Sequence, residues 1–386
     1  MNQPVNTTKT YFENLDFLRF IAFFTVFAGH TAFGTFLINR IHIDVINKFI
    51  WVFSQGGTGV SFFFVLSGFL ITYLLLKEKE KTGKINIRNF YVRRILRIWP
   101  LYYVTILFTF IIYPKVKVML NNIDPVTNNI WMHLTFLSNF DIINSERREM
   151  ITGIKSVPVM IGVNWSIAIE EQFYLVWPLL FAFIPKKLYK YIFFVIILIS
   201  AMFRYINRAD SLVTYFHTLA VFSDLAIGGM FAYFSIYSVR FLQFFQQIKK
   251  WQIMIIYIIG LAFLMYGNDI CPNQYDIAYR RIISTAFFAF IITEQNFSIE
   301  SFYKFGKIKA ITQLGKYTYG LYLLHPIGIQ AVAIVLYKLL KLNETQASTQ
   351  LIYIFASLVA SLIIGYISYT YYEAPFLKLK NKFETK

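Results

Sequence analysis

Long hydrophobic runs separated by short polar segments dominate this chain. About ten runs approach the 20 residues that a helix needs to cross a bilayer, and they lack the alternation typical of a strand. Because lipid offers the backbone no hydrogen-bond partners, such runs must be helical. The sequence therefore predicts an all-α integral membrane protein, a bundle of about ten transmembrane helices with approximate spans 15–37, 57–76, 98–114, 166–184, 191–207, 215–237, 251–267, 280–294, 314–338 and 350–371.

The composition and the charge distribution agree with this class of protein. The chain is 57% hydrophobic and only 15% charged, far from the profile of a soluble protein. Its net charge of +17 is unevenly spread: with the N-terminus inside, 23 of the 37 Lys and Arg residues lie in inner segments. This is the bias that the positive-inside rule describes. We therefore expect cytoplasmic N- and C-termini and the lipid bilayer as a partner, with no nucleic acid.

The segments outside the spans suggest a single membrane domain, 1–386, that ends in a short cytoplasmic tail, 372–386. The longest of them, 115–164, is expected to form a partly folded outer cap, with a re-entrant segment as the alternative. We identify no internal repeat and no secretory signal, since the first run is too long for one and carries charges. Cys271 is the single cysteine, so an intramolecular disulfide is excluded.

Two ionisable residues, Arg19 and His30, lie inside the first hydrophobic run. Eleven residues at 3.6 per turn return to nearly the same helix face, about 16 Å apart along the axis. The run therefore predicts a cation near one end of the span and an imidazole near its middle. Ionisable groups inside a membrane are costly and usually functional. In the alternative interpretation, Arg19 extends to the lipid headgroups while His30 bonds a neighbouring helix.

A second group of charges precedes the third span, in RNFYVRRILRIWP. Arg94 and Arg97 are three residues apart and share a helix face, and Arg93 lies one turn from Arg97. Guanidinium groups bind phosphates through paired donors, so this face is a candidate for anion binding. The alternative is ordinary anchoring by basic residues at the cytoplasmic surface.

Carboxylates and a second histidine appear further along the chain. Glu170 and Glu171 diverge by about 100° on a helix, so we expect one to face the bundle and the other to face solvent or a cation. A carboxylate there could orient an imidazole, or it could simply favour a helix start. His325 is equally compatible with packing and with activity. Glu373 is expected to pair with an inner arginine.

Six segments, in this order, resemble motifs of the acyltransferase-3 family of integral membrane acyltransferases, from Leu15 to about Leu379. They are LDFLRFIAFFTVFAGH, FFFVLSGFLIT, RRILRIWP, NWSIAIEEQFYLVWP, GKYTYGLYLLHP and YEAPF. The first carries the family's Arg-x10-His arrangement and the third its Arg-x-x-Arg element. Tyr73 stands where many members have a small residue. Many members add a C-terminal hydrolase-like domain, and this chain resembles the stand-alone form.

The resemblance implies transfer of an acyl group, usually acetyl, from cytoplasmic acetyl-coenzyme A to a hydroxyl. The implied acceptor is a surface glycan such as O-antigen, exopolysaccharide or peptidoglycan, or a lipid-linked saccharide, at a bacterial inner membrane, and no metal is expected. His30 would act as the general base or first accept the acyl group itself. The remaining expected site residues are Arg19 for donor positioning or charge compensation, Glu170 for orienting the base, and Arg93, Arg94, Arg97 and Gly68 for donor binding.

Two other classes of protein compete with this interpretation. A flippase or exporter of a glycan or lipid-linked precursor would also use intramembrane charges, but the chain shows no internal repeat and the arginine element has no obvious use in transport. A membrane glycosyltransferase would need an acidic metal or sugar-nucleotide site, and the inner loops hold few acids. The oligomeric state is left open by the sequence.

Overall fold

The computed structural model describes residues 12–119, 128–153, 162–272, 277–301 and 303–383, and these contain helices and turns but no strand. The first half comprises α1 Glu13–His30, α2 Phe33–Ile38, α3 Asp44–Phe53, α4 Gly56–Thr82, α5 Ile87–Leu107 with a π turn Phe108–Ile112, α6 Tyr113–Met119, α7 Ile130–Leu134, α8 Ser138–Thr152 and α9 Asn164–Phe183. The second half comprises α10 Tyr189–Ile206, α11 Ser211–Phe216, α12 Thr218–Tyr237, α13 Val239–Gln247, α14 Lys250–Ile270, α15 Ile277–Phe297, α16 Lys309–Gly315, α17 Thr318–Ala333 with a π turn Ile334–Leu339, α18 Ala347–Ile367 with a π turn Ser368–Glu373, and α19 Ala374–Lys380.

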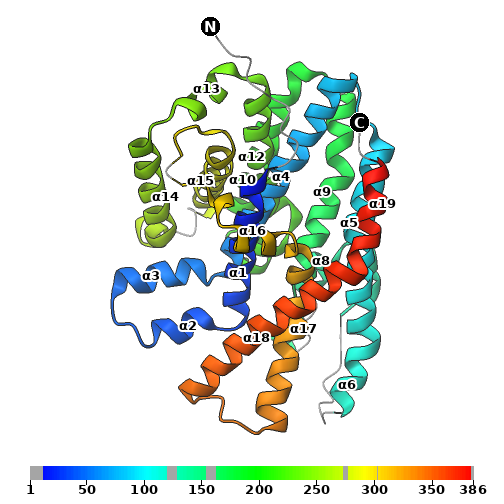
Figure 1. Ribbon diagram of the computed structural model, residues 1–386, viewed down its shortest axis with the longest axis vertical. Coiled ribbons are helices and arrows are strands. Elements are labelled where there is room, and N and C mark those ends of the chain that lie inside the picture. The colour runs from blue at the N-terminus through cyan, green and yellow to red at the C-terminus, as the bar shows by residue number, and fades with distance from the viewer. Residues whose placement is uncertain (1–11, 120–127, 154–161, 273–276, 302, 384–386) are drawn as a thin grey trace.

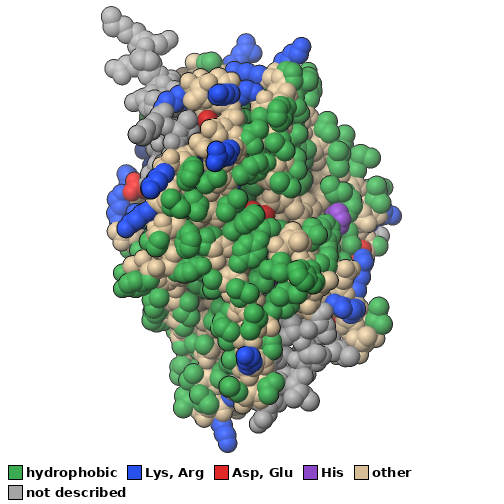
Figure 2. Space-filling view, turned by 90° about the vertical axis from the view of Figure 1, so that its right-hand side faces the viewer, with side chains coloured by type: hydrophobic (Ala, Val, Ile, Leu, Met, Phe, Trp, Pro, Cys, Tyr) green, Lys and Arg blue, Asp and Glu red, His purple; other side chains and the backbone are tan. Residues whose placement is uncertain are grey.

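The long helices form one bundle around α4 and α12 (Figure 1). Helices α13 and α19 lie toward one end of the bundle, whereas α2, α3, α6 and the turn between α17 and α18 lie toward the other. The main hydrophobic core is built from α4, α5, α9, α10, α12 and α17. The outside is also apolar, and Figure 2 shows a broad hydrophobic surface on one face. A protein that is apolar both inside and outside is expected in lipid.

Each predicted span overlaps one or more helices of the structure. Seven helical segments within the described residues are long and apolar enough to cross a membrane, and they correspond to seven of the ten predicted spans. The other three predicted spans, 15–37, 166–184 and 280–294, overlap α1, α9 and α15, which are not among the seven. Each of these three helices carries charged residues, such as Arg19, Glu170 and Arg281. The structure is thus that of an all-α membrane protein, and the count of ten remains a prediction.

The first predicted span differs from the structure in one respect that matters for the site. Helix α1 ends at His30, and Ala32 adopts a left-handed conformation with φ 53° before α2 begins. His30 therefore lies at a helix end and not in mid-span. Gly29 permits this close turn, because a Cβ there would lie 3.0 Å from the Gly56 amide nitrogen at the start of α4. The end of α1 is consequently packed against the first turn of α4.

Helices α4 and α12 cross with their backbones in contact, through two glycines. A Cβ at Gly68 would lie 2.0 Å from the Leu225 carbonyl oxygen, and one at Gly228 would lie 1.9 Å from the Val65 carbonyl oxygen. Small residues at a crossing let membrane helices approach closely. Gly68 is therefore explained by packing, and its expected part in donor binding finds no support in these contacts.

The described part of the predicted outer cap contains α7 and α8, joined by a buried polar network. Asp141 accepts hydrogen bonds from Asn128 Nδ2 at 2.8 Å, from His133 Nε2 at 3.2 Å and from the Asn129 amide at 3.2 Å. Burial by itself would raise the pKa of Asp141, but the hydrogen bonds from His133, Asn128 and Asn129 outweigh it and lower that pKa. The network therefore favours the ionised carboxylate.

The glycine crossing leads to a stability prediction. Gly228→Ala should lower the free energy of unfolding by about 1–3 kcal/mol, because the added methyl group overpacks the backbone contact with Val65. Gly267→Ala is the matched control, since its Cβ would have no neighbour closer than 3.7 Å. Thermal unfolding of the purified proteins in detergent measures both. Equal midpoints for the two variants would contradict the crossing.

The buried carboxylate leads to a pH prediction. Asp141→Asn should cost about 1–3 kcal/mol at neutral pH, because it replaces a buried carboxylate that accepts three hydrogen bonds. A carboxylate with a lowered folded-state pKa stabilises the fold above its ordinary pKa of 3.8 and loses that contribution as pH falls below it. The difference in unfolding midpoint between parent and variant should therefore shrink below about pH 4. A difference that stays constant from pH 7 to pH 3 would contradict this assignment, and the exposed Asp44→Asn serves as control.

Candidate active site

The end of α1 meets the middle of α17 at a pair of histidines. Nδ1 of His30 lies 2.8 Å from Nε2 of His325, and the two rings are stacked with centroids 5.0 Å apart. His325 is completely buried, whereas His30 is exposed. The edges of Phe23 and Phe27 pack against the ring of His325. One imidazole is thus fixed in the core, and it holds a second imidazole that remains accessible.

The hydrogen bonds around this pair determine which nitrogen is available for chemistry. Nδ1 of His325 lies 2.9 Å from the Tyr322 carbonyl oxygen and 3.1 Å from that of Leu321. Because a carbonyl oxygen only accepts, Nδ1 of a neutral His325 carries the proton and Nε2 is an acceptor. His30 then donates from Nδ1, and its own Nε2 keeps a free lone pair. The geometry of a general base is therefore present at His30.

A stripe of polar residues on α17 extends from the histidine pair into the bundle. Tyr319, Tyr322 and His325 are spaced by three and share a helix face. The hydroxyl of Tyr322 lies 2.6 Å from Ser166 Oγ on α9, and that of Tyr319 donates to the Ile98 carbonyl at 2.6 Å on α5. The stripe spans about 9 Å of the helix axis. It connects His325 to the part of α5 that carries the arginines.

The three arginines predicted as a group have different roles in the structure. Arg93 forms an ion pair with Glu78 at 3.2 Å and donates to the Phe383 carbonyl at 2.7 Å. Arg94 and Arg97, in contrast, make no hydrogen bond and no ion pair with any described residue, although Arg94 lies against the rings of Phe90 and Tyr174. Their donors are available to a ligand, whereas those of Arg93 hold the C-terminal segment in place.

Both carboxylates of α9 accept a hydrogen bond from another helix, and both also interact electrostatically with Arg94, so the expected cation partner is found for each of them. Ser67 Oγ donates to Glu170 at 2.6 Å, and Trp99 Nε1 donates to Glu171 at 2.9 Å. Arg97 and Arg94 both act electrostatically on Glu170. Ser67 is eleven residues beyond Gly56 on α4, so Glu170 lies about 16 Å along that helix from the level of His30. The structure does not bring Glu170 to His30, and the partner that orients His30 is His325.

Arg19 and Glu373 lie at about the same height in the bundle as Arg94 and Arg97, and not beside His30. Arg19 forms an ion pair with Asp16, one turn earlier on α1. Asp16 and Arg97 both act electrostatically on Tyr369, and Arg97 acts on Glu373. Glu373 therefore interacts with an inner arginine, as expected, while its direct hydrogen bond comes from Ser368 at 2.9 Å. Arg19 lies too far along α1 to contact His30.

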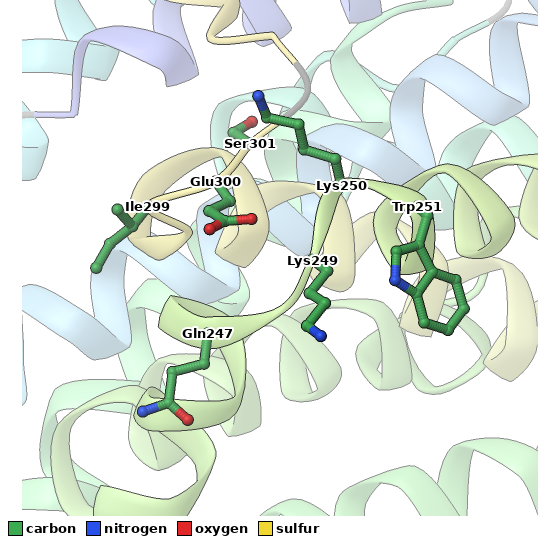
Figure 3. Close-up of a pocket in the computed structure, with 7 residues that line it drawn as sticks. All are labelled: Gln247, Lys249, Lys250, Trp251, Ile299, Glu300 and Ser301. Atoms are coloured by element: carbon green, nitrogen blue, oxygen red, sulfur yellow. The ribbon is translucent and has the colours of Figure 1, made fainter.

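A cavity with a different character lies elsewhere. It measures about 650 Å³ and lies between the α13–α14 junction and the segment that follows α15. Figure 3 shows Lys249 and Lys250 pointing in opposite directions, so its polar groups do not converge on a ligand. Within the described ranges, no group of three or more His, Cys, Asp or Glu side chains could hold a metal ion.

The residues that the sequence interpretation missed are those of the α17 stripe. It left His325 undecided and did not single out Tyr319 or Tyr322. Their spacing of three in GKYTYGLYLLHP is visible in the sequence, but aromatic residues at helical spacing are usually core residues. Only the contacts of these side chains with α1, α5 and α9 distinguish residues of the site from ordinary core residues.

Comparison with known proteins places this geometry in a family. A family model described as an acyltransferase domain, acyltransferase-3, matches residues 12–370. The O-acetyltransferases OatA of Staphylococcus aureus strains NCTC 8325, COL and MRSA252 are each 31% identical to this chain over 293 residues. The match covers 70% of this chain and 46% of each relative, so the chain spans about half the length of the curated relatives it matches. No solved structure matches the chain.

The family match covers the first five sequence motifs and ends just before the sixth, YEAPF at 372–376. It includes both histidines and the arginines of α5. It covers well over half of the chain and agrees with an all-helical bundle that carries seven apolar membrane helices. The chain therefore belongs to the acyltransferase-3 family of membrane acyltransferases.

Proposed function

We propose that this protein transfers an acetyl group from acetyl-coenzyme A to a hydroxyl of a surface glycan, with His30 as the general base. The observation that carries the proposal is the hydrogen bond from His30 to the buried His325, which leaves Nε2 of His30 as an accessible acceptor. The naming of relatives as O-acetyltransferases supports acetyl as the acyl group and oxygen as the acceptor atom. The bacterial source of these relatives supports a location in a bacterial inner membrane.

The chemistry follows from the state of His30. A hydroxyl becomes a useful nucleophile when a base removes its proton in the transition state. Nε2 of His30 takes that proton while the hydroxyl oxygen attacks the thioester carbonyl carbon. The carbon–sulfur bond then breaks, and the departing thiolate takes the proton back from His30. His325 holds the Nδ1–H of His30 throughout, so it keeps the ring oriented and stabilises the imidazolium that forms.

Two free arginines support a donor site at the other end of the α17 stripe. Coenzyme A carries several phosphates, and guanidinium groups bind phosphates through two parallel donors. Arg94 and Arg97 have such donors available, and the Tyr319–Tyr322–His325 stripe leads from their level toward His30. In the expected topology these arginines face the cytoplasm. The donor would bind with its phosphates there and its thioester near His30.

The first prediction for activity concerns the histidine pair. His30→Ala should reduce turnover by at least about 100-fold, the lower range for loss of a general base. His325→Ala should cost roughly 10- to 100-fold, as for other groups that orient an imidazole. Acetylated product is compared for equal amounts of folded protein, and the exposed His42→Ala should match the parent. Substantial turnover by His30→Ala would remove His30 from the role of base.

A second prediction separates the arginines by function. Replacing both Arg94 and Arg97 with Gln should weaken acetyl-coenzyme A binding, and replacing both with Lys should restore only part of it, because an ammonium group lacks the two-point geometry. Affinity should also fall with rising salt, since the groups are only half-buried. Arg93→Gln should instead lower the thermal stability, because it removes the contacts with Glu78 and Phe383.

Titration of the purified parent and variants with acetyl-coenzyme A at two ionic strengths measures these effects. If the double Gln variant binds acetyl-coenzyme A with unchanged affinity, these arginines do not bind the donor, and they serve only to set the orientation of the helices in the membrane. Absence of donor binding to the folded parent would favour the alternative of a flippase or exporter.

A further inference from the structure

A second cavity, distinct from the one in Figure 3, lies beside the first turn of α4, between α9, α11 and α15. It measures about 210 Å³, and its lining includes Gly57, Thr58, Trp165, Tyr215, Arg281 and Ser284. At about 30 Å³ for each water molecule, it has room for roughly seven waters, which suits one small ring and not a long chain. Three aromatic rings and two aliphatic side chains form the apolar part of the lining, and hydroxyls and a guanidinium form its polar part. Such a lining suits a ring that carries a charged group.

The arginine of this cavity keeps one nitrogen for a ligand. Nε and Nη2 of Arg281 donate to the two oxygens of Asp224, at 2.9 and 2.7 Å, and Nη2 also lies 3.3 Å from Ser61 Oγ. Its Nη1 forms no hydrogen bond with any described residue. Asp224 is completely buried, so this ion pair holds the guanidinium in a fixed orientation. Two N–H donors of a fixed arginine in a cavity lining are a ready site for an oxyanion.

The surrounding charges also favour an anion. Arg204 is completely buried; it donates to Ser223 Oγ at 2.8 Å and to the Ala278 carbonyl at 3.1 Å. Asp224 is the only carboxylate that acts on Arg204 or Arg281 within the described part of the chain. Two arginines and one aspartate leave one positive charge in excess. Uncompensated charge inside a protein is costly, and a bound anion would neutralise it.

The cavity lies close to the proposed base. Gly57 follows Gly56, against which the end of α1 packs at Gly29. On the other side, the ring of Tyr215 lies 5.3 Å from that of Trp165, and the next residue, Ser166, is hydrogen-bonded to Tyr322 of the α17 stripe. Aromatic and hydroxyl contacts thus join the cavity to the histidine pair. If one sugar of a glycan is bound in this cavity, the sugars joined to it lie near His30.

We propose that this cavity is an acceptor subsite for an acidic sugar, one that carries a carboxylate or a phosphate bound by Arg281. The proposal rests on acyl transfer as the proposed function and adds the chemical class of the acceptor. The charged group of the sugar binds Nη1 of Arg281, and the ring lies against Trp165 and Tyr215. The glycan is thereby positioned so that a hydroxyl of the same or a neighbouring sugar reaches His30.

The test compares ligands that differ in one group. Purified full-length protein is titrated by calorimetry with methyl glucuronoside, methyl glucoside and inorganic phosphate. We expect the acidic sugar to bind roughly tenfold more tightly than the neutral one, because only the acidic sugar pairs with the guanidinium. Equal affinity for the two sugars, or no binding of either, overturns the proposal. Binding of inorganic phosphate as tight as that of the acidic sugar shows an anion site without sugar recognition and also overturns it.

Two variants separate charge from shape. Arg281→Gln leaves Arg204 and Asp224 in balance, so it should abolish the preference for the acidic sugar, and Arg281→Lys should retain part of it. Gly57→Ala should weaken both sugars alike, because its Cβ would lie 3.0 Å from the Tyr215 ring and would narrow the cavity without changing its charge. A preference that survives in Arg281→Gln overturns the assignment. If that variant fails to fold, the ligand comparison on the parent and the Gly57→Ala result decide.

A separate titration distinguishes the subsite from the proposed function on which it rests. The same preparation of the parent is titrated with acetyl-coenzyme A. Donor binding without a preference for the acidic sugar overturns the subsite alone. Failure of donor binding contradicts the proposed function, whatever the sugars show.

Discussion

The need to satisfy polar groups inside an apolar bundle is the constraint on which the rest of this structure depends. Lipid offers no hydrogen-bond partners, so a buried charge needs a partner from another helix. Asp224 meets Arg281, Glu171 meets Trp99, and Glu170 meets Ser67. Each of these contacts fixes the relative position of two segments. The bundle is therefore specified by a few polar contacts as well as by apolar packing.

Against that background, the arginine donors at the two candidate sites that make no hydrogen bond with a described residue stand out. They are the side chains of Arg94 and Arg97 near one end of the bundle and Nη1 of Arg281 near the other. A guanidinium N–H group that makes no hydrogen bond in a low-dielectric setting is unfavourable unless a ligand accepts one from it. The two sets lie at opposite ends of the α17 stripe. This arrangement suits a reaction whose two substrates approach from different sides of a membrane.

Helix α4 relates all of these positions to one another. Its first turn lines the small cavity and contacts the end of α1, Ser67 in its middle holds Glu170, and Glu78 near its end holds Arg93. The glycine crossing brings its backbone into close contact with that of α12, at Gly68 with Leu225 and at Gly228 with Val65. A change in this crossing would therefore move the site as a whole.

The sequence by itself determined the class of fold, because the apolar runs are long enough to span a bilayer and only helices satisfy the backbone there. It also marked His30 as a candidate site residue, since an ionisable group inside such a run is costly, and the arginines of α5 as candidates, since guanidinium groups on one helix face can bind phosphates. It could not pair His30 with His325, because 295 residues separate them and the contact depends on how α1 packs against α17. Nor could it assign a structural role to Arg93 and a free side chain to Arg94 and Arg97. The three arginines are equivalent in the sequence pattern, and only Arg93 contacts Glu78 and the Phe383 carbonyl. Only the tertiary structure shows these partners, because they depend on how the helices pack against one another, which local sequence patterns do not specify.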